Sequence, residues 1–204
     1  MSRIKICGLF REEDIDYANA LKPDFIGFVF AESRRRVGTE QAAALKKRLD
    51  SDIKAAGVFV NASMEFILDL LNQSVIDTVQ LHGNEDGGFI DNLKSRTCAA
   101  VIKAVPVTDS LSIMEYNDSP ADMLLLDNAK GGSGEPFNKK HLSDALSRGF
   151  KRDFFLAGGI NRDNIKHALE FNPFGIDVSS GAETGGFKDY DKMKEIITII
   201  RNEI

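Results

Sequence analysis

The chain switches eight times between a short apolar run and a helical pattern, and this alternation restricts its fold more than any other feature of the sequence. The apolar runs consist mostly of Val, Ile, Leu and Phe, as expected of strands buried on both faces of a parallel sheet. They predict strands at 4–7, 25–30, 53–60, 78–81, 99–105, 123–127, 154–157 and 175–178. The segments between them predict helices at 11–21, 39–49, 63–73, 88–95, 110–116, 138–147, 162–170 and 189–201.

Alternating strands and helices belong to the α/β class, in which the parallel sheet is either open and doubly wound or closed into a barrel. Eight pairs with no break in composition favour the closed (β/α)8 TIM barrel. The 204 residues are enough for one domain and few for such a barrel, so the loops must be short. We therefore expect a single barrel domain over residues 1–204.

Charge and composition exclude several classes of protein. A net charge of −5 argues against a general nucleic-acid-binding surface. No apolar run approaches the ~20 residues that span a bilayer, and the start of the chain has no signal-peptide pattern, so we expect a cytoplasmic protein. The 2 cysteines and 3 histidines are scattered, and we expect neither a disulfide framework nor a metal site.

Small residues follow the last two predicted strands. One strand leads into Gly158 and Gly159, and the other contains Asp177 and leads into Ser180 and Gly181. Backbone N–H groups at such loops can surround a phosphate, and the last two strands of a barrel often carry this site. A plain surface turn would explain the glycines but not the acid within an apolar strand. We predict a phosphate site at these two loops.

Two side chains that can transfer protons end inward-facing strands. Side chains alternate between the barrel interior and the helix layer, and catalytic groups come from the C-terminal strand ends. This alternation turns Lys5 and Cys7 inward and places Asp127 at the same rim. Cys7 could be a small buried apolar residue, and Asp127 could cap a turn. At the rim, however, a thiolate is a competent base if nearby cations lower its pKa.

Other polar side chains are predicted at the same rim. Arg34, Arg35 and Arg36 follow the second strand, and one guanidinium could bind a substrate carboxylate in a bidentate pair, although arginines in loops are usually solvated. The fourth strand directs Gln80 and His82 to one face, where we expect them to contact the substrate. His82 is equally compatible with a catalytic group and with a hydrogen-bonded histidine of the rim.

Several of these motifs together resemble the phosphoribosylanthranilate isomerase family. They lie in order along nearly the whole chain, at residues 5–8, 27–30, 33–37, 57–61, 79–83, 125–127, 131–134, 157–160 and 177–181. The resemblance implies the Amadori rearrangement of N-(5′-phosphoribosyl)anthranilate to 1-(2-carboxyphenylamino)-1-deoxyribulose 5-phosphate in L-tryptophan biosynthesis. It implies an aldose–ketose isomerase without metal or organic cofactor, whose partner is the small phosphoribosyl substrate. The protein would act as a monomer or a homodimer.

The resemblance also assigns roles to single residues. The family's general base is a cysteine of the first strand and its general acid an aspartate of the sixth, which carries over to Cys7 and Asp127. Its carboxylate-binding arginine aligns best with Arg35. Asp177 would support the ribose end of the substrate. The phosphate would be held by Gly158, Gly159, Ser180 and Gly181.

The chain departs from the family pattern in two places. Arg34 replaces a frequent proline, which leaves Arg34 and Arg36 as alternatives to Arg35. Asn138-Lys139 stands where the family often has an Asp-Trp pair after a mobile loop. This loop, residues 128–137, is rich in glycine and could act as a lid over the site or be a passive linker.

Fold and phosphate site alone do not determine the chemistry of a barrel. One alternative is another phosphosugar-processing barrel enzyme, such as an epimerase or indole-glycerol-phosphate synthase, but these have no use for a strand-one Cys paired with a strand-six Asp. The other is a non-catalytic barrel that binds a phosphometabolite. Binding of a ligand without turnover would favour this second alternative.

Overall fold

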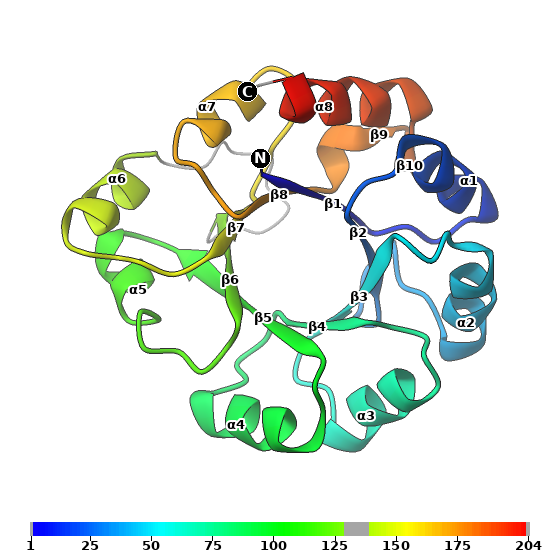
Figure 1. Ribbon diagram of the computed structural model, residues 1–204, viewed down its shortest axis with the longest axis horizontal. Coiled ribbons are helices and arrows are strands. Elements are labelled where there is room, and N and C mark those ends of the chain that lie inside the picture. Colours follow the sequence, from blue (N-terminus) through cyan, green and yellow to red (C-terminus); the bar gives the residue numbers. More distant parts are fainter. Residues whose placement is uncertain (1, 129–138, 203–204) are drawn as a thin grey trace.

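The computed structural model of the protein describes residues 2–128 and 139–202. Eight parallel strands form a closed barrel in the order β1 to β8, in which β8 pairs with β1, and helices surround it (Figure 1). The strands are β1 (Arg3–Cys7), β2 (Phe25–Val29), β3 (Lys54–Phe59), β4 (Thr78–Leu81), β5 (Ala100–Val107), β6 (Met123–Asn128), β7 (Phe154–Leu156) and β8 (Gly175–Val178). The helices are α1 (Glu12–Leu21), α2 (Thr39–Arg48), α3 (Met64–Asn72), α4 (Gly87–Arg96), α5 (Ser110–Met114), α6 (Lys139–Ser147), α7 (Ile165–Leu169) and α8 (Tyr190–Asn202).

The predicted barrel and its strand–helix pairs are confirmed, with small differences at the ends of elements. The largest concerns α7, which we predicted from residue 162 and which begins at Ile165. Asn161 and Asn164 explain the delay: the Asn161 side chain accepts from the Asp163 N–H, and the Asn164 side chain accepts from the Asn161 N–H. Such local bonds compete with the helical pattern. Residues 129–137 of the predicted lid at 128–137, and residue 138 at the predicted start of the sixth helix, lie outside the described residues.

The sequence analysis missed three short elements between β8 and α8. A 3-10 helix, η1 (Ser180–Ala182), leads into a hairpin of β9 (Glu183–Thr184) and β10 (Phe187–Lys188). Gly185 and Gly186 form its turn with φ angles of 60° and 90°, which favour glycine. Figure 1 shows the hairpin close to α1 and α8, at the rim beside β1. It therefore adds side chains to the mouth of the barrel.

Alternation of side chains along the strands sorts the apolar residues into two clusters. Ile4 and Ile6 of β1 belong to the large cluster that packs under the helices. A smaller cluster fills the barrel interior and consists of Phe25, Ile102, Ala104, Met123, Leu125, Phe155 and Ala157. Lys5 and Cys7 face this interior, as predicted. The mouth above the small cluster is the place where polar side chains gather.

Helix ends are marked by local signals in the sequence. Ser63 caps α3 by accepting from the Phe66 N–H, and Lys22 ends α1 in the left-handed conformation immediately before Pro23. In the described part of the chain, no helix is long and apolar enough to cross a membrane.

Candidate active site

A cavity of about 530 Å³ opens at the C-terminal ends of the barrel strands. Its lining comprises Cys7, Val29, Ala31, Glu32, Ser33, Arg34, Arg35, Val58, Val60, Gln80, His82, Asp127, Ala157, Gly158, Gly159, Ile160, Asp177, Ser179 and Ser180. Nine of the ten predicted site residues are among them. The tenth, Gly181, lies in a neighbouring depression with Asn161 and Lys192. Folding therefore gathers groups from β1, β2, β4, β6, β7 and β8 around one space.

Cys7 lies at the end of β1 and is almost completely buried. A Cβ on Gly27, its partner on β2, would lie 2.7 Å from Cys7 Sγ, so a glycine is needed there to make room for the thiol. Burial raises the pKa of the Cys7 thiol, although the nearby Lys5 ammonium opposes this shift. We expected nearby cations to lower this pKa. That expectation is wrong for this structure, because the loss of solvation outweighs the attraction of the lysine.

Lys5 and Asp177 form a buried ion pair directly beside Cys7. Lys5 Nζ donates to Asp177 Oδ1 at 2.8 Å, and the Lys5 side chain has no exposed surface. Burial disfavours the ammonium, but the negative charges of Asp177 and Cys7 outweigh it and raise the pKa of Lys5. Asp177 therefore keeps the Lys5 ammonium charged beside the Cys7 thiol. The contact of Asp177 with the ribose stays a prediction.

Asp127 faces the cavity from β6. Its Oδ1 accepts from the Asn128 N–H at 2.8 Å, and its Oδ2 lies 3.5 Å from His82 Nε2. A Cβ on Gly158 would lie 2.8 Å from the Asn128 nitrogen and 3.0 Å from Asp127 Oδ1. Gly158, which has a φ of 85°, thus allows the loop after β7 to approach the carboxylate closely.

The arginines after β2 meet a buried carboxylate from the hairpin that the sequence analysis missed. Glu183 accepts from Arg35 Nε at 2.6 Å and Arg35 Nη2 at 2.9 Å, from Arg34 Nη2 at 2.6 Å and from Lys188 Nζ at 2.7 Å. Burial opposes the charge of Glu183, but the bonds from Arg35 and Lys188 outweigh it and lower the pKa of Glu183. Arg36 is exposed and is not among the described residues that line the cavity.

A sequence signal for Glu183 exists. Gly185-Gly186 between two short runs is a typical two-residue hairpin loop, and such a hairpin places Glu183 opposite Lys188. The pattern does not show that Arg35 binds Glu183, because the two residues are 148 positions apart in the chain. Gly8 completes the arrangement: a Cβ there would overlap the Arg35 side chain, which lies across the end of β1.

The two loops predicted to bind phosphate are in contact with each other. Gly158 and Gly159 have φ angles of 85° and 70°, which let the chain turn sharply after β7. A Cβ on Gly181 would overlap the carbonyl oxygen of Ile160, so the loop after β8 approaches the loop after β7 only with glycine at this position. Ser180, which begins η1, lies where both loops meet the cavity.

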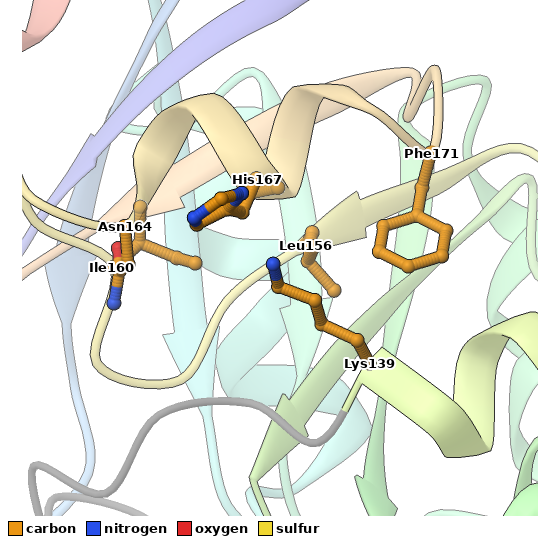
Figure 2. A pocket seen from close by; sticks show the side chains of 7 residues that line it. Lys139, Leu156, Ile160, Asn164, His167 and Phe171 are labelled. Atoms are coloured by element: carbon orange, nitrogen blue, oxygen red, sulfur yellow. The ribbon is translucent and has the colours of Figure 1, made fainter.

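A second, small pocket lies between β7, α6 and α7, outside the barrel interior (Figure 2). Its volume of about 40 Å³ is that of a few water molecules, and its lining is Lys139, Leu156, Ile160, Asn164, His167, Ala168 and Phe171. Figure 2 shows Lys139 and His167 beside each other at its edge. A phosphosugar does not fit there. Among the described residues, no group of three or more His, Cys, Asp or Glu is placed to hold a metal ion.

Comparisons with known proteins agree with the barrel fold. Residues 4–199 match the family model of N-(5′-phosphoribosyl)anthranilate isomerase. The isomerase of Endomicrobium trichonymphae is 43% identical over 208 residues, which cover 99% of this chain and 100% of that protein. The crystal structure of the Thermus thermophilus isomerase is 34% identical, with a TM-score of 0.87 and 98% of each chain covered. A solved complex of such an isomerase with reduced 1-(o-carboxyphenylamino)-1-deoxyribulose 5-phosphate is 33% identical, with a TM-score of 0.85 and 97% of each chain covered. This chain belongs to the N-(5′-phosphoribosyl)anthranilate isomerase family.

Proposed function

We propose that Cys7 and Asp127 carry out the two proton transfers by which this protein isomerises N-(5′-phosphoribosyl)anthranilate. As a member of its family it is an aldose–ketose isomerase of tryptophan biosynthesis. The observation that supports the assignment is that a thiol from β1 and a carboxylate from β6 line one cavity with Arg35 and the two glycine loops. Those groups suit the two ends of a substrate that carries a carboxylate and a phosphate.

The reaction needs an acid and a base in sequence. Asp127 donates a proton to the ring oxygen of the ribose, the bond between C1 and this oxygen breaks, and a protonated Schiff base forms between C1 and the anthranilate nitrogen. The thiolate form of Cys7, which is the minor form at neutral pH because burial raises the pKa of this thiol, then removes the proton from C2. The resulting enol loses its hydroxyl proton while C1 gains one, which yields the aminoketose. The substrate gains one proton from Asp127 and loses one to Cys7, so its composition is unchanged. Release of a proton from Cys7 to solvent and uptake of one by Asp127 restore both groups for the next turnover.

Arg35 is the best placed of the three arginines to bind the anthranilate carboxylate. Glu183 occupies the edge of its guanidinium formed by Nε and Nη2, which orients the group and leaves its outer edge to face a substrate. Arg34 is more exposed, and Arg36 is exposed and is not among the described residues that line the cavity. The ligand of the solved relative, which carries both a carboxyphenyl group and a phosphate, has the same two ends.

The test is turnover of freshly generated substrate by Cys7→Ser and Asp127→Asn, together with binding of the reduced product analogue. We expect kcat to fall about 10²–10⁴-fold in each variant, with binding retained. Cys98→Ser is the matched control, because this second cysteine is exposed and precedes β5, at the end of the strand opposite to the mouth. Near-normal turnover in Cys7→Ser or Asp127→Asn would refute the role assigned to that residue. Binding without turnover in the parent protein would favour a non-catalytic barrel.

The role of Arg35 in binding the substrate carboxylate is tested by comparing two arginine variants. Arg35→Ala should raise KM for the substrate at least tenfold, which corresponds to about 1.4 kcal/mol of lost binding. Arg36→Ala removes the same charge from an exposed position and should leave KM close to that of the parent. A larger effect at Arg36 would contradict the assignment. The cytoplasmic location and the state as monomer or homodimer stay predictions.

A further inference from the structure

We propose that Gln80 is a positioning residue that holds His82 in its neutral form, with the proton on Nε2, and thereby allows Asp127 to carry the proton that it donates. The proposal rests on the role of Asp127 in the proposed function. It concerns three side chains at one wall of the cavity: Gln80 of β4, His82 directly after β4, and Asp127 of β6.

The contact between Gln80 and His82 indicates which nitrogen of the ring carries the proton. Gln80 Nε2 lies 3.0 Å from His82 Nδ1. An amide nitrogen only donates, so Nδ1 has to accept and cannot carry a proton. The proton of the neutral ring is therefore on Nε2, which faces Asp127 Oδ2 at 3.5 Å. At this distance the contact is electrostatic rather than a short hydrogen bond.

The burial of Gln80 argues against a purely structural role. The residue is 1% exposed, and its Oε1 has no hydrogen-bond partner among the described residues. Leaving a buried carbonyl without a partner is costly, and an apolar side chain of similar size would avoid that cost. The bond to His82 is what the amide adds at this position. It makes protonation of Nδ1 unfavourable, because a second N–H would point at the N–H of the amide.

Neutrality of the ring matters because of what lies beside it. An imidazolium next to Asp127 would stabilise the carboxylate and so remove the proton that a general acid must supply. A neutral Nε2–H leaves this proton in place and still stabilises the carboxylate after the proton has moved to the substrate. Gln80 thus acts on the acid through His82, and its predicted contact with the substrate stays a prediction.

Three other charged groups of the cavity lining are paired elsewhere. The remaining titratable side chains of the lining are Cys7, Glu32, Arg34, Arg35 and Asp177. Asp177 is paired with Lys5, and both arginines with Glu183. Behind the loop after β4, Lys103 Nζ lies 3.1 Å from Glu85 Oε2 and donates to the Gly83 carbonyl oxygen at 2.6 Å. Among the described ion pairs, Asp127 is the carboxylate that faces the ring of His82.

Nitrogen-15 NMR of the parent protein tests the proposal directly. The chain has 3 histidines, so His82→Phe identifies the ring signals of His82 against those of His141 and His167. We expect the shift pattern of a neutral ring protonated on Nε2 at pH 7. A ring protonated on Nδ1, or on both nitrogens, would overturn the proposal. This readout needs neither turnover nor a folded Gln80 variant, so it is independent of the roles of Cys7 and Asp127.

Two substitutions of Gln80 test the consequence for catalysis. Gln80→Glu places a carboxylate against Nδ1, which should add the second proton to His82. We then expect kcat to fall about tenfold or more, and the limb of the kcat–pH profile set by Asp127 to move to lower pH. Gln80→Met, the matched control of similar size, removes the selection of the tautomer without creating an imidazolium. It should lower kcat less and leave that limb in place. Equal pH profiles for Gln80→Glu and Gln80→Met would contradict the proposal, whereas turnover by Asp127→Asn would instead refute the acid itself.

Discussion

Removal of the Glu183 carboxylate should destabilise the protein by about 3 kcal/mol, because it leaves a buried ammonium without its counter-charge. The side chains of Glu183 and Lys188 are 4% and 0% exposed, and breaking such a pair from one side costs about 3–5 kcal/mol. The lower end applies because Lys188 Nζ also donates to the Ser179 carbonyl oxygen at 3.0 Å. Arg34 and Arg35 are more exposed and can regain water, so their loss adds little.

The diagnostic measurement is a double-mutant cycle of Glu183→Ala and Lys188→Met. In the parent background Lys188→Met should cost about 1 kcal/mol, because Glu183 keeps both of its arginines. In the Glu183→Ala background the same change removes the unpaired charge and should regain about 1–3 kcal/mol. The effect of Lys188→Met on the free energy of unfolding therefore changes sign. Urea unfolding followed by circular dichroism at one temperature measures all four proteins.

An exposed ion pair provides the control for this cycle. Arg48 Nη1 lies 2.6 Å from Glu12 Oε2, and these side chains are 45% and 71% exposed. Their coupling should stay below about 1 kcal/mol, as for surface pairs in general. If Lys188→Met destabilises the protein equally with and without Glu183, the reasoning on the buried charge is wrong.

Three further predictions follow from the loops and the ionisable groups. Gly181→Val should weaken binding of the phosphate-bearing product analogue at least about tenfold in a titration, because a side chain overlaps the carbonyl of Ile160 and separates the two loops; unchanged affinity would exclude this phosphate site. Burial alone would raise the pKa of Glu85, but bonds from backbone N–H groups and Lys103 outweigh it and hold this pKa below the ordinary 4.5. The unfolded chain then binds the proton more tightly, so this stabilisation is complete above pH 4.5 and is lost as pH falls through the folded pKa. Glu85→Gln should accordingly flatten the acid side of a plot of Tm against pH, and an unchanged slope would count against the pair. Because burial raises the pKa of Cys7 above its ordinary 9.0, thiolate absorbance at 240 nm in a Cys98→Ser background should appear only above about pH 9; a midpoint near 7 would contradict the burial argument.

The barrel and the inward direction of its rim residues were predictable because they depend on short-range periodicity. A side chain on a strand points to the opposite face from its neighbour whatever surrounds it, so Cys7, Asp127 and His82 could be placed on the inner face from their positions alone. Gly158 and Gly159 after β7 likewise carry a local conformational preference that is visible in the chain.

Ion-pair partners and pKa shifts could not be predicted from the sequence. They depend on atoms that come close together only when the barrel closes. Lys5 meets Asp177 across 172 positions, and Arg35 meets Glu183 across 148. The nearness of Lys5 suggested a lowered pKa for Cys7, yet the atoms that exclude water from the thiol come from several strands and reverse the shift. Desolvation and pairing are set by distance in space, whereas periodicity and turn preferences are set by neighbours in the chain.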